Sequence, residues 1–364
     1  MNDRMKKTTP RSVARAATPR RKWLFFLILL LLVPVVIEGV LRIPGVGPMS
    51  YAPRRFEPDG RVPFVPAGNS KAQQVVYDRN VTFSSVYDPR GDTRGYFGSE
   101  GRVVYRLNMF GIRGPDIPWA KAANGFRVLC LGDSITFGEG VKEEDTYAMQ
   151  LQRLLGAGMK DRQAEVINQG VQGYGTKEEV GAYFMVGRAY QPDVVIVGFY
   201  LNDATDFGET IRQNDAKNRD VPLSGLARVS KAMEIVERRR IATAQQEEFF
   251  AATRKSFQSP LWQTGKDELL RLKGDMLQWK SRLVVVIFPV LWQLDAYPLD
   301  DIHKQLNDDF KRLGLEHLDL LDAFRGMDAE SLWVHPTDQH PNEIAHRIAA
   351  ARIAEYLKTP APIP

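Results

Sequence analysis

The stretch FRVLCLGDSITFG, residues 126–138, decides the fold class of this 364-residue chain. Its first seven residues form a nearly continuous apolar run, which is typical of a strand buried on both faces of a sheet. A Gly-Asp-Ser turn follows the run, and a helical pattern begins at residue 145. A buried strand followed by a turn and a helix indicates an α/β fold.

Four more segments of strand character follow along the chain. They read EVINQG (165–170), DVVIVGFY (193–200), RLVVVIFP (282–289) and a weaker LEHLDLLD (315–322). Helical patterns alternate with them, at 145–159, 176–190, about 226–256, 263–280, 298–313 and 342–358. This alternation predicts a parallel sheet of about five strands with right-handed crossovers. In such a sheet, sites form at the carboxyl ends of the strands.

Three of these strand ends carry residues suited to acyl chemistry. Ser134 follows the first strand on a strand-to-helix turn, which can present its hydroxyl at the sheet edge. Gly173 follows the second strand in a glycine-rich turn, and Asn202, beside Asp203, follows the third. An asparagine amide there can donate to a developing oxyanion. Taken singly, each is equally explained as a helix cap or a turn residue.

The segment WVHPTDQHPN, residues 333–342, precedes the last helical pattern and supplies a histidine close to an acid. Activation of a serine requires this pair, because the histidine takes the proton and the acid holds its tautomer. Asp338 and His340 are the candidates, and His335 is the alternative base. We interpret His303, His317 and His346 as ordinary helix or loop residues.

The four blocks together resemble the SGNH, or GDSL-type, hydrolase family over about residues 126–357. The resemblance implies a doubly wound, flavodoxin-like sheet, a serine hydrolase activity, and no metal or organic cofactor. It implies that Ser134 is the nucleophile, His340 the general base and Asp338 the orienting acid. It also implies that the oxyanion is bound by the Ser134 N–H, the Gly173 N–H and the Asn202 side chain. We expect Asp133 and Asp203 to support the site.

The last block departs from the family pattern in the position of the acid. The commonest pattern has the acid three residues before the histidine, where this chain has Thr337, and here Asp338 lies two residues before His340. Without a correctly placed acid, a Ser134–His340 dyad would still work with lower efficiency.

The formal net charge of +5 and the pI of about 9.1 suggest a nucleic acid or an anionic membrane as partner. However, eight of the 49 basic residues and one of the 44 acidic residues lie in residues 1–22, so the rest of the chain is slightly acidic. The basic charge is therefore a topology signal, and we expect no nucleic acid partner.

An uncharged apolar stretch, WLFFLILLLLVPVVI, follows this basic tail at residues 23–37. We interpret residues 23–42 as a transmembrane signal-anchor, with residues 1–22 in the cytoplasm and the rest exported from the inner membrane. A cleaved signal peptide and a buried core helix are the alternatives, although no small-x-small cleavage site closes the run. Residues 43–125 are predicted to be a proline-rich linker and a small extended or β arm, and residues 126–358 the hydrolase domain.

These features predict a serine-dependent acyl ester hydrolase of the cell envelope, acting on a small-molecule or polysaccharide ester. An O-acyltransferase of an envelope polysaccharide and a catalytically silent polysaccharide-binding or assembly module are the alternatives. The charged segment 205–260 is either a lid or a solvated surface helix. A single cysteine, Cys130, excludes an internal disulfide framework, and nothing in the sequence predicts the oligomeric state.

Overall fold

The computed structural model describes residues 19–43, 52, 54–58, 64–66, 75–159, 161–205 and 222–359. The chain divides into two compact units. One comprises Met1–Ser50 and Val221–Ala244, and the other comprises Tyr51–Asp220 and Gln245–Pro364.

A parallel sheet of five strands forms the centre of the larger unit. Its strands are β6 (Gly125–Gly132), β7 (Gln163–Gly170), β8 (Val194–Phe199), β9 (Arg282–Ile287) and β10 (His317–Asp319). They lie in the order β7-β6-β8-β9-β10, and every neighbouring pair is parallel. Numbered along the chain, this is the order 2-1-3-4-5 of flavodoxin-like sheets. The predicted fold class is confirmed.

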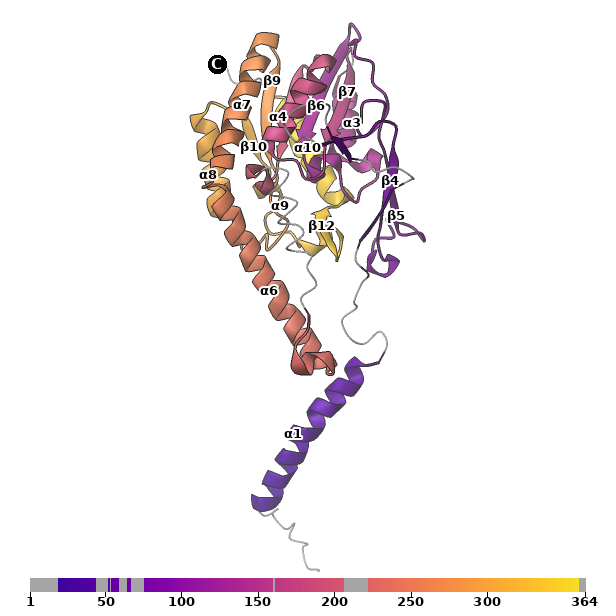
Figure 1. The fold of residues 1–364 in the computed structure, drawn as a ribbon, viewed down its shortest axis with the longest axis vertical. Helices are drawn as coiled ribbons and strands as arrows, with labels where there is room; N and C mark the ends of the chain where they lie inside the picture. Colours follow the sequence, from indigo (N-terminus) through magenta and orange to yellow (C-terminus); the bar gives the residue numbers. More distant parts are fainter. Residues whose placement is uncertain are drawn as a thin grey trace, which may run out of the picture. The chain divides into compact units, whose positions relative to one another are not determined.

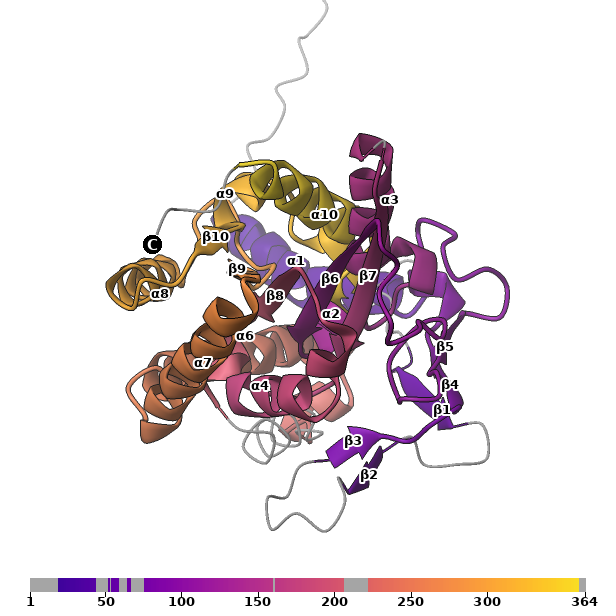
Figure 2. The same cartoon turned by 90° about the horizontal axis from the view of Figure 1, so that it is seen from above.

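Helices cover both faces of the sheet. Figure 2 shows α3 and α10 side by side on one face, and α4 and α7 on the other. The helix bounds are α2 (Ser134–Phe137), α3 (Tyr147–Gly158), α4 (Thr176–Met185), α7 (Pro260–Trp279), α8 (Asp300–Arg312), α9 (Leu321–Phe324) and α10 (Glu343–Leu357). Side-chain caps begin several of them: the Thr146, Ser259 and Asn342 oxygens accept from backbone N–H groups of the first turn.

The order of the strands along the chain reverses at β6, which pairs with β7 on one side and with β8 on the other. Ligands of doubly wound folds bind at this switch point. Gly132 and Gly170, the last residues of β6 and β7, lie side by side with Gly198, the second-last residue of β8. A Cβ at Gly170 would lie 2.1 Å from the backbone nitrogen of Phe137, so glycine is what lets α2 rest directly on the sheet edge.

Antiparallel strands from residues 55–106 form the β arm of the larger unit. β1 (Arg55–Pro58), β4 (Thr82–Val86) and β5 (Arg102–Arg106) pair in the order β1-β4-β5, and β2 (Phe64–Pro66) pairs with β3 (Val75–Tyr77). Phe83 and Tyr105 of the arm pack against Phe137 of α2, with ring centroids 5.9 and 5.2 Å apart. The arm therefore shares a core with the turn that carries Ser134. Of the predicted linker and arm, residues 44–51, 53, 59–63 and 67–74 lie outside the described residues.

The smaller unit contains helix α1 (Pro19–Leu41), a 3-10 turn η5 (Gly225–Arg228) and the first part of α6 (Lys231–Ser256). Residues Lys22–Leu41 of α1 have a mean hydropathy of 2.9 and are long and apolar enough to cross a membrane, a property that signal sequences share (Figure 1). Only Phe250, Thr253 and Ser256 of α6 are buried, as expected of a solvated helix. The alternative lid includes residues 206–221, which lie outside the described residues.

Candidate active site

The turn between β6 and α2 presents Ser134 at the carboxyl edge of the sheet. The Asp133 carboxylate begins α2 by accepting a hydrogen bond from the Ile135 N–H at 2.8 Å. Gly132 has φ +155°, and a Cβ there would lie 2.1 Å from the Thr136 hydroxyl oxygen. A larger residue at position 132 would therefore displace the turn that positions the serine.

A two-stranded hairpin, β11 (Trp333–His335) and β12 (Asp338–Pro341), carries the acid and the histidine. The Asn342 amide after the hairpin donates to the Ser331 and Trp333 carbonyls. Its side-chain oxygen accepts from the first N–H groups of α10. Asn342 thus fixes the hairpin to a long helix, which holds both candidate residues on rigid structure.

Ser134, His340 and Asp338 lie in one hydrogen-bonded row. His340 Nε2 is 2.9 Å from Ser134 Oγ, and His340 Nδ1 is 2.5 Å from Asp338 Oδ1. Because an ionised carboxylate only accepts, Nδ1 carries the ring proton and Nε2 accepts from the serine hydroxyl. This is the arrangement that prepares a serine to attack a carbonyl carbon.

The charge states of the pair support this arrangement. Burial raises the pKa of Asp338, but the neighbouring His340 and Arg54 outweigh it and hold this pKa below its usual range. Burial lowers the pKa of His340, but the Asp338 carboxylate outweighs it, so the net shift is upward. Asp338 is therefore ionised at neutral pH and strengthens His340 as a base.

His335, the alternative base, is engaged at both ring nitrogens. Its Nε2 lies 3.0 Å from the Asp88 carbonyl oxygen, to which it must donate. Its Nδ1 therefore accepts, and it does so from the hydroxyl and the N–H of Thr337. Thr337, at the family's usual position of the acid, thus orients His335. His303 is likewise committed, to Asp319 at 2.9 Å and to the Tyr297 hydroxyl at 3.2 Å.

The predicted oxyanion donors also follow the strand ends at the switch point. Asn202 lies on the 3-10 turn η4 (Leu201–Ala204) after β8, and its amide nitrogen donates to Asp133 at 3.1 Å. Asp203 accepts from the Tyr200 N–H at 2.6 Å, which fixes that turn. Gly173, in the turn after β7, has φ +80°, a conformation that favours glycine.

Three buried carboxyl groups lie close to Asn202 and to one another. Asp133, Glu179 and Asp203 are each at most 1% exposed. Burial raises the pKa of Asp133, and it raises the pKa of Glu179 and Asp203 well above their usual values. Burial thus disfavours negative charge on Glu179 and Asp203, and such charge would repel an oxyanion at Asn202.

The β arm and the loop after α2 supply site residues that the motif analysis missed. The Tyr87 hydroxyl donates to Asp338 Oδ2 at 2.9 Å, and Arg54 Nη1 lies 3.2 Å from the same oxygen. Arg54 Nη1 also lies 2.8 Å from Glu139 Oε1. Tyr87 and Arg54 are 251 and 284 residues from Asp338 in sequence, so no local motif could have indicated the contact.

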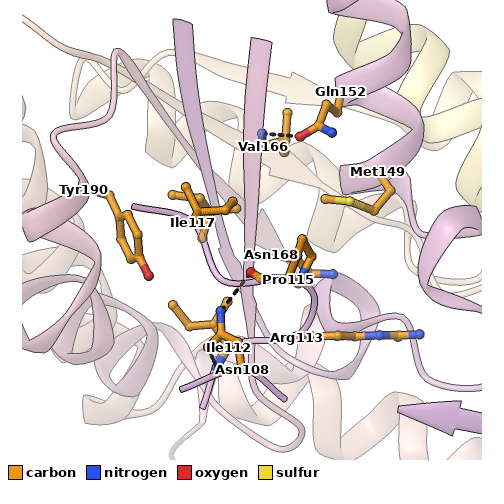
Figure 3. Close-up of a pocket in the computed structure, with 11 residues that line it drawn as sticks. Asn108, Ile112, Arg113, Pro115, Ile117, Met149, Gln152, Val166, Asn168 and Tyr190 are labelled. Atoms are coloured by element: carbon orange, nitrogen blue, oxygen red, sulfur yellow. Dashed lines mark hydrogen bonds between the residues drawn. The ribbon is translucent and has the colours of Figure 1, made fainter. Parts of the chain in front are cut away.

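A small cavity lies beside strand β7, whose residues Val166 and Asn168 line it (Figure 3). It is lined by apolar and amide side chains and by Arg113, and it includes none of the predicted site residues. The buried Arg113 guanidinium donates to the carbonyls of Phe137, Gly138 and Val141. Arg113 therefore braces the segment after α2. Cys130 on β6 is fully buried, and burial raises the pKa of its thiol to about 12, so it is unreactive.

Comparison with known proteins identifies the family of the chain. The model of the GDSL-like lipase/acylhydrolase family matches residues 130–348, more than half of the chain. The chain belongs to this family, and it is a carboxylic ester hydrolase. The family predicted from the four sequence blocks is confirmed.

Similar solved structures include a putative lipolytic G-D-S-L family protein from Desulfitobacterium hafniense, with 14% identity, 63% of this chain and 98% of that chain covered, and a TM-score of 0.40. They also include a mutant acetyl-xylooligosaccharide esterase from Geobacillus, with 16% identity, 66% and 98% covered, and a TM-score of 0.43. A search of the curated proteins finds no match.

Proposed function

We propose that the chain is a serine-dependent acyl ester hydrolase of the cell envelope that acts through an acyl-enzyme on Ser134. The observation that carries this proposal is the row Ser134–His340–Asp338, with contacts of 2.9 and 2.5 Å. The substrate is an acyl ester of a small molecule or of an envelope polysaccharide.

Each residue has a defined part in the reaction. His340 Nε2 takes the hydroxyl proton as Ser134 Oγ bonds to the ester carbonyl carbon. The oxyanion receives hydrogen bonds from the Ser134 and Gly173 N–H groups and from Asn202. His340 returns its proton to the departing alcohol as the ester C–O bond breaks. Water then attacks the acyl-enzyme, with His340 taking one water proton and returning it to Ser134 as the acid is released.

Replacing Asn202 with alanine is expected to lower kcat by about 100-fold to 1,000-fold while changing KM little. The amide is expected to bind charge that develops only in the transition state, so its loss weakens transition-state binding more than substrate binding. Steady-state kinetics on an aryl acetate checks this prediction. Asn124→Ala, in an exposed turn, is the matched control. A rise in KM with unchanged kcat would show that Asn202 binds substrate instead.

The acid limb of the kcat/KM profile is expected to have its midpoint above the ordinary histidine value of about 6.5. The base must be neutral to accept a proton, and the Asp338 carboxylate favours the protonated imidazole. Activity therefore falls as pH decreases through the raised pKa of His340. The measurement is kcat/KM against pH with a substrate that does not titrate in this range. A midpoint below 6.5 would contradict the assigned pair.

Hydrolysis and acyl transfer differ only in the acceptor of the acyl group. We expect free acetate to be the main product when the enzyme is incubated with an aryl acetate, with or without oligosaccharides. Mass spectrometry of the sugars and an acetate assay measure both outcomes. Acetylated sugar that forms at the expense of free acetate would establish the O-acyltransferase instead.

We further propose that α1 is an uncleaved anchor in the inner membrane, with the catalytic domain outside the cytoplasm. The basic residues before the apolar run of α1 support this orientation, and the mean hydropathy of 2.9 supports a spanning helix. A phosphatase fused after Pro364 is expected to be active, because that reporter works only after export. An inactive fusion would contradict the orientation, and a shortened membrane-free product would indicate cleavage.

A further inference from the structure

The β arm and the loop after α2 surround the oxygen of Asp338 that His340 does not use. Tyr87 and Arg54 contact Asp338 Oδ2, while Oδ1 contacts His340. Tyr87 is 2% exposed, and its ring stacks on Phe97 with centroids 4.6 Å apart. A hydroxyl on a ring held in this way restricts rotation of the Asp338 carboxylate.

Arg54 bridges two carboxylates that would otherwise repel each other. Its Nη1 lies 2.8 Å from Glu139 Oε1 and 3.2 Å from Asp338 Oδ2. Glu139 is 1% exposed and accepts hydrogen bonds from the Ser85 and Tyr105 hydroxyls. The Arg54 guanidinium thus lies between the Glu139 carboxylate and the Asp338 carboxylate, which polarises His340.

We propose that Tyr87, Arg54 and Glu139 are positioning residues that set the orientation of Asp338 and the basicity of His340. This proposal rests on the proposed Ser134–His340–Asp338 mechanism. It assigns a role to the β arm, because Tyr87 and Arg54 of the arm complete the surroundings of Asp338. Tyr87 fixes the geometry, while Arg54 and Glu139 act on the imidazolium with opposite sign.

The titratable and charged groups near His340 include more than the three proposed positioning residues. Asp338 and Glu139 raise the pKa of His340, and Arg54 lowers it. Asp133 lies in the nucleophile turn, where burial raises its pKa. Burial lowers the pKa of His346 on α10 to about 3, so it is neutral in the working range.

The charge effect is tested by a pair of variants with opposite expected signs. Arg54→Gln removes a cation and is expected to raise the acid-limb midpoint of kcat/KM by about half a pH unit or more. Glu139→Gln removes an anion and is expected to lower that midpoint. Arg54→Lys keeps the positive charge, and its midpoint is expected to lie close to that of the wild type. If the midpoint shifts in the same direction in both glutamine variants, or does not shift in either, the proposed role of charge is overturned.

Because Glu139→Gln alters a buried network, thermal unfolding checks its folding. If it does not fold, Arg54→Gln and Arg54→Lys decide the matter. Tyr87→Phe keeps the ring and is expected to lower kcat about tenfold with KM little changed. Tyr96→Phe in the same arm, whose hydroxyl donates to Asp145, is the matched control. Loss of nearly all activity in Ser134→Ala, together with unaltered kinetics of Arg54→Gln and Tyr87→Phe, would refute positioning while leaving the mechanism intact.

An independent observation concerns the smaller unit, where the end of α1 contacts the start of α6. The Glu38 carboxylate accepts hydrogen bonds from the Lys231 and Ala232 N–H groups and from the Ser230 hydroxyl. Arg42 donates to the Val229 carbonyl. Glu38 interrupts the apolar run of α1, and these donors satisfy its charge at the first turn of α6.

Apolar side chains at this junction are exposed. Leu226 and Val229 are 69% and 68% exposed, and Met233 and Val236 are 42% and 59% exposed. Exposed arginines accompany them at positions 228, 238, 239 and 240. Apolar side chains beside basic ones are typical of a segment that lies in the interface of a bilayer with anionic lipids.

We infer that residues 226–236 dock on the surface of the bilayer that α1 is proposed to span. The contacts of Glu38 and Arg42 hold this segment at the end of the spanning helix, so its apolar side chains lie at the depth of the lipid headgroups. This inference rests on the proposed anchor, and the experiment separates the two.

The full chain is reconstituted in nanodiscs of phosphatidylglycerol and phosphatidylcholine with a single environment-sensitive label at an introduced cysteine. Cys130 is fully buried, so the unsubstituted chain measures the background. Labels at Val229→Cys and Met233→Cys are expected to be quenched by lipids spin-labelled near the headgroup. Thr243→Cys, about 15 Å farther along α6 than Met233, is the control and is expected to be unaffected.

A label at Leu30→Cys reports on the anchor itself and is expected to be quenched by lipids spin-labelled deep in the acyl chain. Quenching at Leu30 without quenching at Val229 and Met233 would overturn the docking while leaving the anchor. Absence of quenching at all positions would contradict the anchor as well.

Discussion

The Ser134→Ala variant is expected to lose at least about 10,000-fold in kcat on an aryl acetate while remaining folded. The mechanism passes the acyl group through Ser134 Oγ, and alanine offers no atom to which the carbonyl carbon can bond. His340 Nε2, which accepts from Ser134 at 2.9 Å, then has no proton to remove. The residual rate would come from the oxyanion donors acting on water.

Steady-state rates and thermal unfolding of the purified variant check this result. Ser331→Ala, at an exposed serine whose hydroxyl donates to the Asp328 carbonyl, is the matched control and should keep full activity. Retention of more than about one hundredth of the wild-type rate by Ser134→Ala would contradict a nucleophilic role. That outcome would favour direct attack by water.

The Asp338→Asn variant is expected to lose about 1,000-fold to 10,000-fold in kcat with little change in KM. An amide that keeps its oxygen toward Tyr87 and Arg54 presents its NH₂ group to His340 Nδ1. The ring would then carry its proton on Nε2 and could not accept from Ser134. The Asp338→Asn variant would thus keep the shape of the site but hold His340 in the wrong tautomer.

Kinetics at several pH values test this prediction. Asp322→Asn, at an exposed side chain on α9, is the control for the loss of one carboxylate. Partial recovery of Asp338→Asn at high pH would agree with a tautomer effect. A loss below tenfold would show that Ser134 and His340 work as a dyad, without help from the acid.

The strand ends could be predicted from the sequence because each is a local pattern. The apolar runs at 126–132, 165–170, 193–200 and 282–289 are confirmed as β6, β7, β8 and β9, with small shifts of their ends. The weaker run at 315–322 is confirmed as the short strand β10. Since the sheet brings the carboxyl ends together, residues after separate strands could be predicted to meet.

The surroundings of Asp338 could not be predicted in this way. Tyr87 lies directly after β4 and Arg54 directly before β1, on short strands of the β arm. Neither position belongs to a repeating pattern, and their contacts depend on how the arm packs against α2. Likewise, the sequence around Glu38 shows only a charge after an apolar run, and the partners of Glu38 at the start of α6 lie 192–194 residues away.

The most direct test of the central claim is the mass of the enzyme after reaction with a serine-reactive fluorophosphonate. We predict a single adduct on the tryptic peptide that contains Ser134. The adduct should form slowly in Asp338→Asn and be absent in Ser134→Ala. An adduct on another serine, or none on an enzyme that still hydrolyses esters, would contradict an acyl-enzyme on Ser134.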